Sequence, residues 1–207
     1  MRITNLLDKN AILLNADISD KKTAINTLIE MHDKAGNLSD KEKYKEGIFA
    51  REKESTTAVG EGIAIPHAKS SAVLRPGLAA MTVLNGIEYG APDGKPSNLF
   101  FMIAAPEDGD LHLEVLSRLM TLLMDLDLRK KLLSAQTADE FLQMIDEAEE
   151  AKFKEHIYTH KEYQVRVYNH ILKFSEITAE LVERQYFQEF SLTQNQTISP
   201  HNDKYPF

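Results

Sequence analysis

The stretch of the sequence best suited to chemistry presents one histidine behind two glycines and a proline. Residues 60–69 read Gly-Glu-Gly-Ile-Ala-Ile-Pro-His-Ala-Lys, so His67 directly follows Pro66. Glycine permits positive φ and close approach of another chain, while proline fixes φ and lacks an N–H donor. We therefore expect a rigid, exposed imidazole, partly neutral at physiological pH and able to attack a phosphoryl group. The stretch alone fits an unreactive loop histidine equally well.

Three other residues carry groups that a phosphorylated histidine would need. Arg51 offers a planar fork of donors suited to phosphate oxygens. His112 stands at an expected helix start, where the positive end of the helix dipole favours a phosphoryl group. Glu61 could orient an imidazole or an incoming donor, although its charge would otherwise repel phosphate. Taken singly, the three fit a helix-end cation, a helix-capping histidine and a solvated loop acid equally well.

The same residues permit a rival reading, a metal-dependent hydrolase with His67, His112 and Glu61 as ligands. Against it, the three show no compact ligand spacing along the chain. A guanidinium at Arg51 would also repel a cation bound there. We therefore predict neither a metal nor another cofactor.

Composition indicates a globular protein with an acidic surface. The chain has 207 residues, 43% of them hydrophobic and 27% charged, which is enough for one domain plus an extension. Lys and Arg balance Asp and Glu after residue 150, seven against seven, so the excess of eight negative charges lies in residues 1–150. This balance argues against nucleic acid as a partner and allows the docking of a basic protein. With no cysteine present, disulfides, thiolate catalysis and thiolate metal sites are excluded within these residues.

The sequence contains no run of about eighteen apolar residues such as a membrane span requires, and its start lacks the apolar core of a signal peptide. We therefore expect a cytoplasmic protein without direct membrane insertion.

Short apolar runs bounded by turn residues predict the strands of a sheet. Asn85-Gly86 and Pro92-Asp93-Gly94 read as turn signals between two of these runs, and residues 86–90 could add a strand or extend a hairpin. The expected strands cover residues 11–14, 55–59, 78–84 and 99–104.

Helical periodicity alternates with these strands. Ser19 or Asp20 can cap a first helix that ends at Gly36, and Ser39 with Glu42 forms a capping box for a second helix that ends near residue 53. A third helix opens at residues 109–110 and is expected to bury Leu113, Leu116, Leu119, Met120 and Leu123. Residues 127–133 continue helical, and Thr137 with Glu140 forms a further capping box. Strands between helices predict an α/β fold, a three-layer sandwich whose mixed central sheet has helices on both faces.

Residues 151–207 differ from the first 150 and form a separate unit in our prediction, a helical extension of unknown function. They contain no glycine and hold four of the seven histidines. A helical pattern runs from about residue 163 to residue 186, and the polar end after residue 191 is expected to be disordered. His156 and His160 have the i, i+4 spacing of a zinc pair, but no acidic ligand stands at a useful spacing, so we interpret them as a solvated face.

The stretch 60–69 resembles part of a known family. It is preceded by Arg-Glu at residues 51–52 and followed by Asp-Leu-His-Leu-Glu-Val-Leu at residues 110–116. It is similar to the IIA domain of the bacterial phosphoenolpyruvate-dependent sugar phosphotransferase system, fructose/mannitol type. The resemblance covers about residues 1–150, and the ordered Gly-Glu-Gly-x-Ala-x-Pro-His core is specific.

The resemblance implies a phosphoryl relay. A domain of this family takes a phosphoryl group from the phosphocarrier protein HPr onto its active histidine, here His67, through Nε2. It passes the group to a IIB domain, whose acceptor in this type is a cysteine. Arg51, Glu61 and His112 match the family's supporting positions, and neither metal nor nucleotide is required.

The run at residues 92–106 looks most like fructose-specific members, which are often joined to IIB and IIC domains. Here no IIB or IIC domain is expected after residue 150, which leaves the origin of the extension open. Relatives of this domain also act as phosphorylation-sensitive regulators of the nitrogen-related or transcription-regulator type, and the same residues would serve that role.

Overall fold

The computed structural model describes residues 2–154 and, within them, one mixed β-sheet. Neighbouring strands follow the order β1-β5-β6-β3-β2, and β4 pairs with β6 as well. β1 is parallel to β5, β5 is antiparallel to β6, and both β3 and β4 are parallel to β6. The strands are β1 (Leu7–Leu13), β2 (Ala58–Gly60), β3 (Ile63–Ala64), β4 (His67–Lys69), β5 (Gly77–Ile87) and β6 (Ser97–Ala105).

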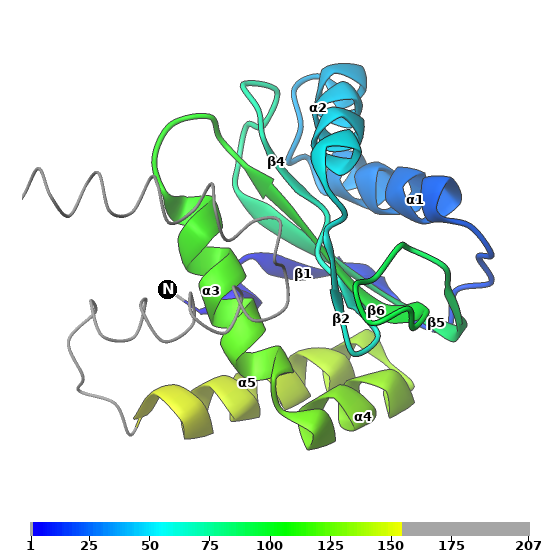
Figure 1. The fold of residues 1–207 in the computed structure, drawn as a ribbon. Helices are drawn as coiled ribbons and strands as arrows, with labels where there is room; N and C mark the ends of the chain where they lie inside the picture. Colours follow the sequence, from blue (N-terminus) through cyan, green and yellow to red (C-terminus); the bar gives the residue numbers. More distant parts are fainter. Residues whose placement is uncertain (1, 155–207) are drawn as a thin grey trace, which may run out of the picture. The chain divides into compact units, whose positions relative to one another are not determined.

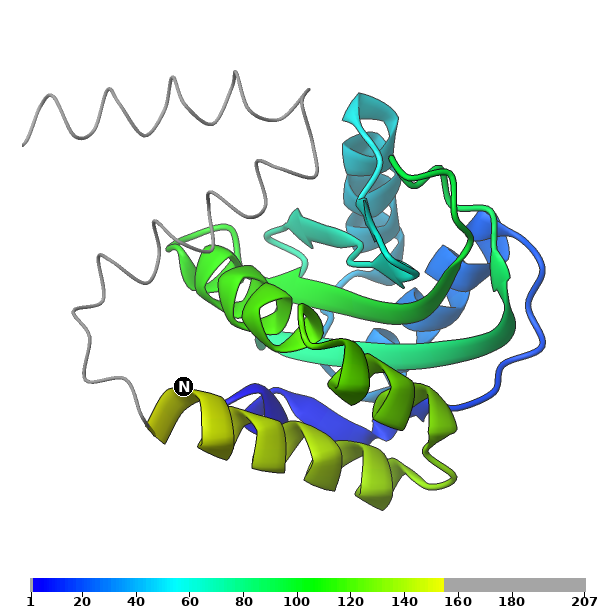
Figure 2. The ribbon, with the colours of Figure 1, turned by 60° about the horizontal axis from the view of Figure 1, so that its bottom comes forward.

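Helices cover both faces of this sheet (Figures 1 and 2), which confirms the predicted three-layer α/β sandwich. One layer consists of α1 (Lys21–Lys34) and α2 (Lys41–Glu54). The opposite layer consists of α3 (Leu111–Leu123), α4 (Leu126–Ser134) and α5 (Ala138–Lys154). The short 3-10 helix η1 (Ile3–Asn5) belongs to the same layer.

The central strand β6 shows why the sheet needs two helical layers. Its side chains alternate between the two cores, with Phe100 and Met102 facing α1 and α2 and Phe101 and Ile103 facing α3 to α5. All four are at most 1% exposed. Successive residues of a strand point to opposite faces, so a strand that is apolar at every position must be buried on both sides. Each such side chain contributes about 1.5–3 kcal/mol of burial free energy.

The helix starts depend on carboxylate and hydroxyl caps. Asp20 accepts from the backbone N–H of Thr23 at 2.9 Å and caps α1, as the sequence suggested. The Ser39 cap was wrong: Asp40 caps α2 by accepting from Lys43 N at 3.0 Å. The Ser39 hydroxyl instead donates to the carbonyl of Ala72.

Two further expectations need correction. Asn85-Gly86 is not the hairpin turn, because β5 runs on to Ile87 with a register shift between Thr82 and Ile87. Gly86 adopts φ +67° within this irregularity, a conformation that suits glycine. Leu113, predicted to be buried, is 41% exposed.

At the carboxyl end, α5 continues to Lys154, four residues past the predicted domain boundary at 150. The predicted helix at 163–186, the disordered end and the pair His156 and His160 lie outside the described residues. The division at residue 150 therefore stays a prediction.

Candidate active site

The candidate nucleophile lies at the first position of β4, which follows β3 along the same side of β6. Ile63 of β3 pairs with Leu99 of β6, and His67 of β4 pairs with Ile103 of β6. Between them, Ile65 N donates to the carbonyl of Thr57 at 3.0 Å, and Pro66 O accepts from Ile103 N at 3.0 Å. Proline lacks the N–H that a regular strand would use here, which explains the short break between the strands. The backbone that presents His67 is thus bonded on both sides.

The imidazole of His67 is held in one tautomer by its own backbone. Its Nδ1 lies 2.7 Å from the carbonyl oxygen of Ile65, and because a carbonyl can only accept, Nδ1 carries the hydrogen. In the neutral ring Nε2 is then left with a free lone pair. The side chain is half-buried rather than exposed as predicted. Burial lowers the pKa of His67, while the hydrogen bond to Ile65 opposes that shift.

Arg51 lies in the last turn of α2, as predicted, and α2 packs against β4. Its Nη1 donates to the carbonyl oxygen of Ser55 at 2.9 Å and to the Ser55 hydroxyl at 3.0 Å. These bonds fix the guanidinium at the end of the helix. Its positive charge is close enough to lower the pKa of His67.

His112 lies in the first turn of α3, in the other helical layer, close enough for the charge of His67 to act on its pKa. Burial, followed by the charges of Lys69 and His67, lowers the pKa of His112 to about 4. The ring is therefore neutral at physiological pH and carries one N–H donor. Its Nδ1 is buried and finds no hydrogen-bond partner within residues 2–154.

Glu61 lies apart from these three groups. It occupies the turn between β2 and β3 with φ +53°, and its carboxylate pairs with Lys95 at 3.0 Å and with Arg129 at 3.6 Å. From Leu99 to Ile103 the pairing moves four residues along β6, which is about 13 Å at roughly 3.3 Å per residue. Glu61 lies just before the residue paired with Leu99, and His67 is the residue paired with Ile103, so the two are separated by about this length. The structure thus brings together His67, Arg51 and His112, and not Glu61.

A different acid, Glu52, lies close enough to the imidazole for its negative charge to raise the pKa of His67. The Glu52 side chain is only 5% exposed. Tyr44, Ile48 and Glu52 follow at i, i+4 and i+8 on α2, which places the acid on the buried face of the helix. An acidic residue on an apolar helix face was the signal that could have identified it from the sequence.

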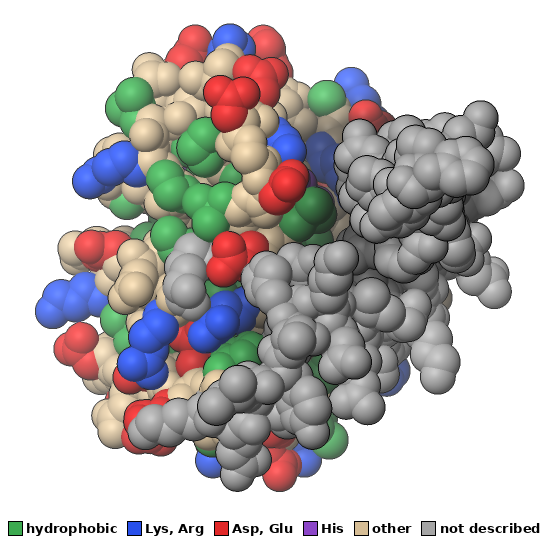
Figure 3. Space-filling model, turned by 90° about the vertical axis from the view of Figure 1, so that its left-hand side faces the viewer, with side chains coloured by type: hydrophobic (Ala, Val, Ile, Leu, Met, Phe, Trp, Pro, Cys, Tyr) green, Lys and Arg blue, Asp and Glu red, His purple; other side chains and the backbone are tan. Residues whose placement is uncertain are grey.

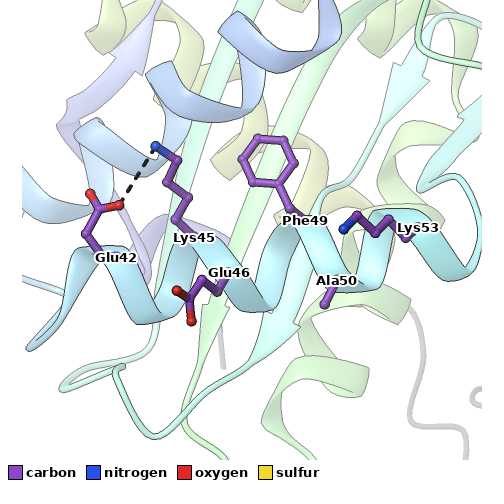
Figure 4. A pocket seen from close by; sticks show the side chains of 6 residues that line it. All are labelled: Glu42, Lys45, Glu46, Phe49, Ala50 and Lys53. Atoms are coloured by element: carbon purple, nitrogen blue, oxygen red, sulfur yellow. Dashed lines mark ion pairs between the residues drawn. The ribbon is translucent and has the colours of Figure 1, made fainter.

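A surface hollow among the described residues holds no histidine. The pocket in Figure 4 is lined by α2 side chains alone, among them Phe49 and the ion pair Glu42–Lys45 at 3.9 Å. On the described part of the face in Figure 3, acidic, basic and hydrophobic side chains alternate. Among residues 2–154, no three His, Asp or Glu side chains are grouped so that they could hold a metal ion. Of the rival ligand set, Glu61 lies apart from His67 and His112, as described above.

Comparisons with known proteins identify the family of this chain. The family model "Phosphoenolpyruvate-dependent sugar phosphotransferase system, EIIA 2" matches residues 5–148. The chain is 46% identical over 148 residues to the PTS system fructose-specific EIIABC component of Bacillus subtilis, covering 71% of this chain and 23% of that protein. It is 39% identical to the PTS system fructose-specific EIIA component of Haloferax volcanii, over 65% of this chain and 88% of that one.

Solved structures share the fold. The nitrogen regulatory protein IIA-Ntr from Neisseria meningitidis superposes with a TM-score of 0.65 at 30% identity, over 69% of this chain and 98% of that one. The complex of enzyme IIAMtl and phosphorylated enzyme IIBMtl from Escherichia coli contains a match with a TM-score of 0.62 at 26% identity, over 69% and 99%. Within the part of the chain that is described, no helix combines the length and the apolar character needed to cross a membrane.

Proposed function

Because the chain belongs to the EIIA 2 family of phosphoenolpyruvate-dependent sugar phosphotransferase systems, we propose that His67 carries a phosphoryl group between two protein partners. The donor is the phosphorylated form of HPr, and the acceptor is a IIB domain with a reactive cysteine. The sugar served is fructose, in line with the fructose-specific relatives from B. subtilis and H. volcanii. The chain spans less than a quarter of the B. subtilis protein, so a IIB domain belongs either to a separate chain or to a longer form of this one.

In the first step, the Nε2 lone pair of His67 attacks the phosphorus of the donor. A P–Nε2 bond forms, the bond between phosphorus and the donor breaks, and the donor keeps that electron pair. The Nδ1–H keeps its hydrogen bond to the carbonyl of Ile65 throughout. This fixed acceptor therefore stabilises the positive charge that develops on the ring. The observation that carries the proposal is this bond, because it leaves Nε2 as the free nucleophile.

In the second step, the cysteine thiolate of the IIB domain attacks the same phosphorus. A P–S bond forms, the P–Nε2 bond breaks, and His67 regains its lone pair and its neutral form. Neither step consumes a proton, a metal ion or a nucleotide at this site. Phosphoryl transfer depends mostly on positioning and on charge stabilisation, which Arg51 and the neutral His112 supply from two sides of the imidazole.

A regulatory role is the second candidate, and the likeness to IIA-Ntr favours it at 30% identity. In that role phosphorylated His67 changes the affinity for a partner protein, with no onward transfer. The geometry at His67 serves both roles, so the fate of the phosphoryl group separates them. Rapid loss of the group to a IIB domain supports transport, and stable phosphorylation-dependent binding supports regulation.

The test is incubation of the full chain with phosphoenolpyruvate, enzyme I and HPr, followed by intact-mass measurement. We expect one added phosphate that is labile in acid, absent from His67→Ala and present in the matched control His112→Ala at a reduced rate. Nitrogen NMR of the phosphorylated chain should place the phosphorus on Nε2. A folded wild-type chain that gains no phosphate would overturn the proposal.

A further inference from the structure

Glu52 is a buried acid whose carboxylate is surrounded by donors from three segments. It accepts from the phenol of Tyr89 at 2.9 Å, from the backbone N–H of Thr57 at 3.4 Å and from the Thr57 hydroxyl. Lys21 Nζ lies 2.8 Å from Oε2, the oxygen that also accepts from Thr57 N–H, and 4.3 Å from the centre of the Tyr89 ring. Burial and the nearby carboxylate raise the pKa of Tyr89, so the phenol stays protonated and donates. The charge is thus compensated, and its position is fixed.

A continuous series of hydrogen bonds connects this carboxylate to the candidate nucleophile. Glu52 holds Thr57 at both its N–H and its hydroxyl. The carbonyl of Thr57 accepts from Ile65 N at 3.0 Å, and the carbonyl of Ile65 accepts from His67 Nδ1 at 2.7 Å. The residues span α2, the start of β2 and the break between β3 and β4. Displacement of Thr57 would therefore move the carbonyl that selects the tautomer of His67.

A purely structural explanation accounts poorly for a carboxylate at this position. A charge removed from water costs several kcal/mol unless it is paired, and well-packed apolar residues can often replace a buried ion pair without loss. The neighbouring positions on the same face of α2 hold buried hydrophobic residues, Tyr44 and Ile48. What an apolar residue could not supply is a negative charge beside an imidazole that becomes positive during transfer.

We propose that Glu52 is the positioning residue of His67: through Thr57 and Ile65 it holds the Nδ1–H tautomer, and its charge stabilises the ring as phosphorus binds at Nε2. Within residues 2–154, Lys21 from α1 and Tyr89 from the segment after β5 contact the Glu52 carboxylate, and the imidazole of His67 lies within reach of its charge. The proposal rests on the phosphoryl-carrier function above, but the state of the imidazole can be measured without any transfer.

The first test compares Glu52→Gln with Glu54→Gln, an equal change of charge at an exposed position of the same helix. NMR of the His67 ring nitrogens reports the tautomer and the pKa directly. In the wild type and in Glu54→Gln we expect the hydrogen on Nδ1. In Glu52→Gln we expect a lower pKa, a larger share of the Nε2–H tautomer and phosphorylation by HPr slowed roughly tenfold or more.

The second test separates position from charge. Thr57→Val removes the hydroxyl bond and keeps the carboxylate, so it should shift the tautomer and slow transfer without lowering the pKa of His67. The transfer rate of the double variant Glu52→Gln/Thr57→Val should fall by less than the product of the two single losses, because both substitutions remove the same contact. If Glu52→Gln does not fold, Thr57→Val and Tyr89→Phe give the same readouts.

A folded Glu52→Gln chain with the wild-type tautomer, pKa and transfer rate would overturn the inference. Wild-type values in both Thr57→Val and Tyr89→Phe would do so if Glu52→Gln is unfolded. If the wild type gains no phosphate although Glu52→Gln alters tautomer and pKa, the carrier function fails and the positioning of His67 by Glu52 stands.

Discussion

Arg51 and Glu52 are neighbours in α2 whose opposite charges act on one imidazole. The guanidinium of Arg51 lowers the pKa of His67, and the carboxylate of Glu52 raises it. Burial lowers that pKa more than either charge does. The site thus keeps the resting ring neutral while holding an anion beside it.

Replacement of Arg51 tests the cationic half of this arrangement. Arg51→Gln should raise the pKa of His67 and slow phosphorylation by roughly a hundredfold, because a donor aimed at developing negative charge is lost. Lys53→Gln, an exposed cation two residues further on, serves as the control and should behave as wild type. Equal transfer rates in the two variants would remove Arg51 from the reaction.

The lowered pKa of His67 sets the pH range in which the ring can accept phosphate. A base whose folded pKa lies below its ordinary value of about 6.5 stays neutral to more acidic pH. An NMR titration of the His67 ring should therefore give a midpoint below about 6.5. A midpoint at or above that value would contradict the burial of the imidazole described here.

Glu61 offers a contrast, since its carboxylate is engaged by Lys95 and Arg129 at the other end of the β3–β4 segment. Glu61→Gln should change the phosphorylation rate by less than about twofold and the free energy of unfolding by less than about 1 kcal/mol, as for exposed ion pairs. Stopped-flow phosphorylation and urea unfolding check the two values. A loss as large as that of Arg51→Gln would show that the turn moves toward His67 when HPr docks.

His32 is a fully buried histidine of α1, and it should make the fold sensitive to acid. Its Nε2 donates to the carbonyl of Met102 and its Nδ1 accepts from Asn37, and burial lowers its pKa to about 4. Between pH 6.5 and pH 4 the unfolded chain binds the extra proton, so stability falls as pH falls through that window. The loss from His32 alone is about 3 kcal/mol. Urea unfolding should show a weaker pH dependence in His32→Gln than in the wild type; an unchanged dependence would exclude this histidine as the cause.

The sequence predicted the layers well, because they depend on local patterns. Apolar runs specify strands buried on two faces, whereas the short strand β4 that begins at His67 was not predicted. The Ser39 cap failed because Asp40, one residue nearer the helix, has an equally good acceptor. Asn85-Gly86 failed because a glycine with positive φ fits an irregular strand as well as a turn.

The supporting groups were harder to predict, since they depend on contacts between distant segments. Glu61 is two residues from the edge of β3, yet its partner Lys95 stands 34 positions later in the chain. Glu52 contacts Tyr89 across 37 positions. No pattern within one helix or one turn contains that information. The buried face of α2 still indicated that an acid at position 52 required partners.

The parallel pairing of β4 with β6 has a consequence for the order of folding. His67 is paired with Ile103, so within residues 2–154 the strand that presents it has no partner strand until β6 has been added. Contacts across such long separations form late, after local ones. A chain emerging from the ribosome would therefore expose its histidine long before that histidine is aligned for attack. Phosphorylation of His67 would then occur only in chains whose sheet is complete, and it could be used to measure how many chains have folded.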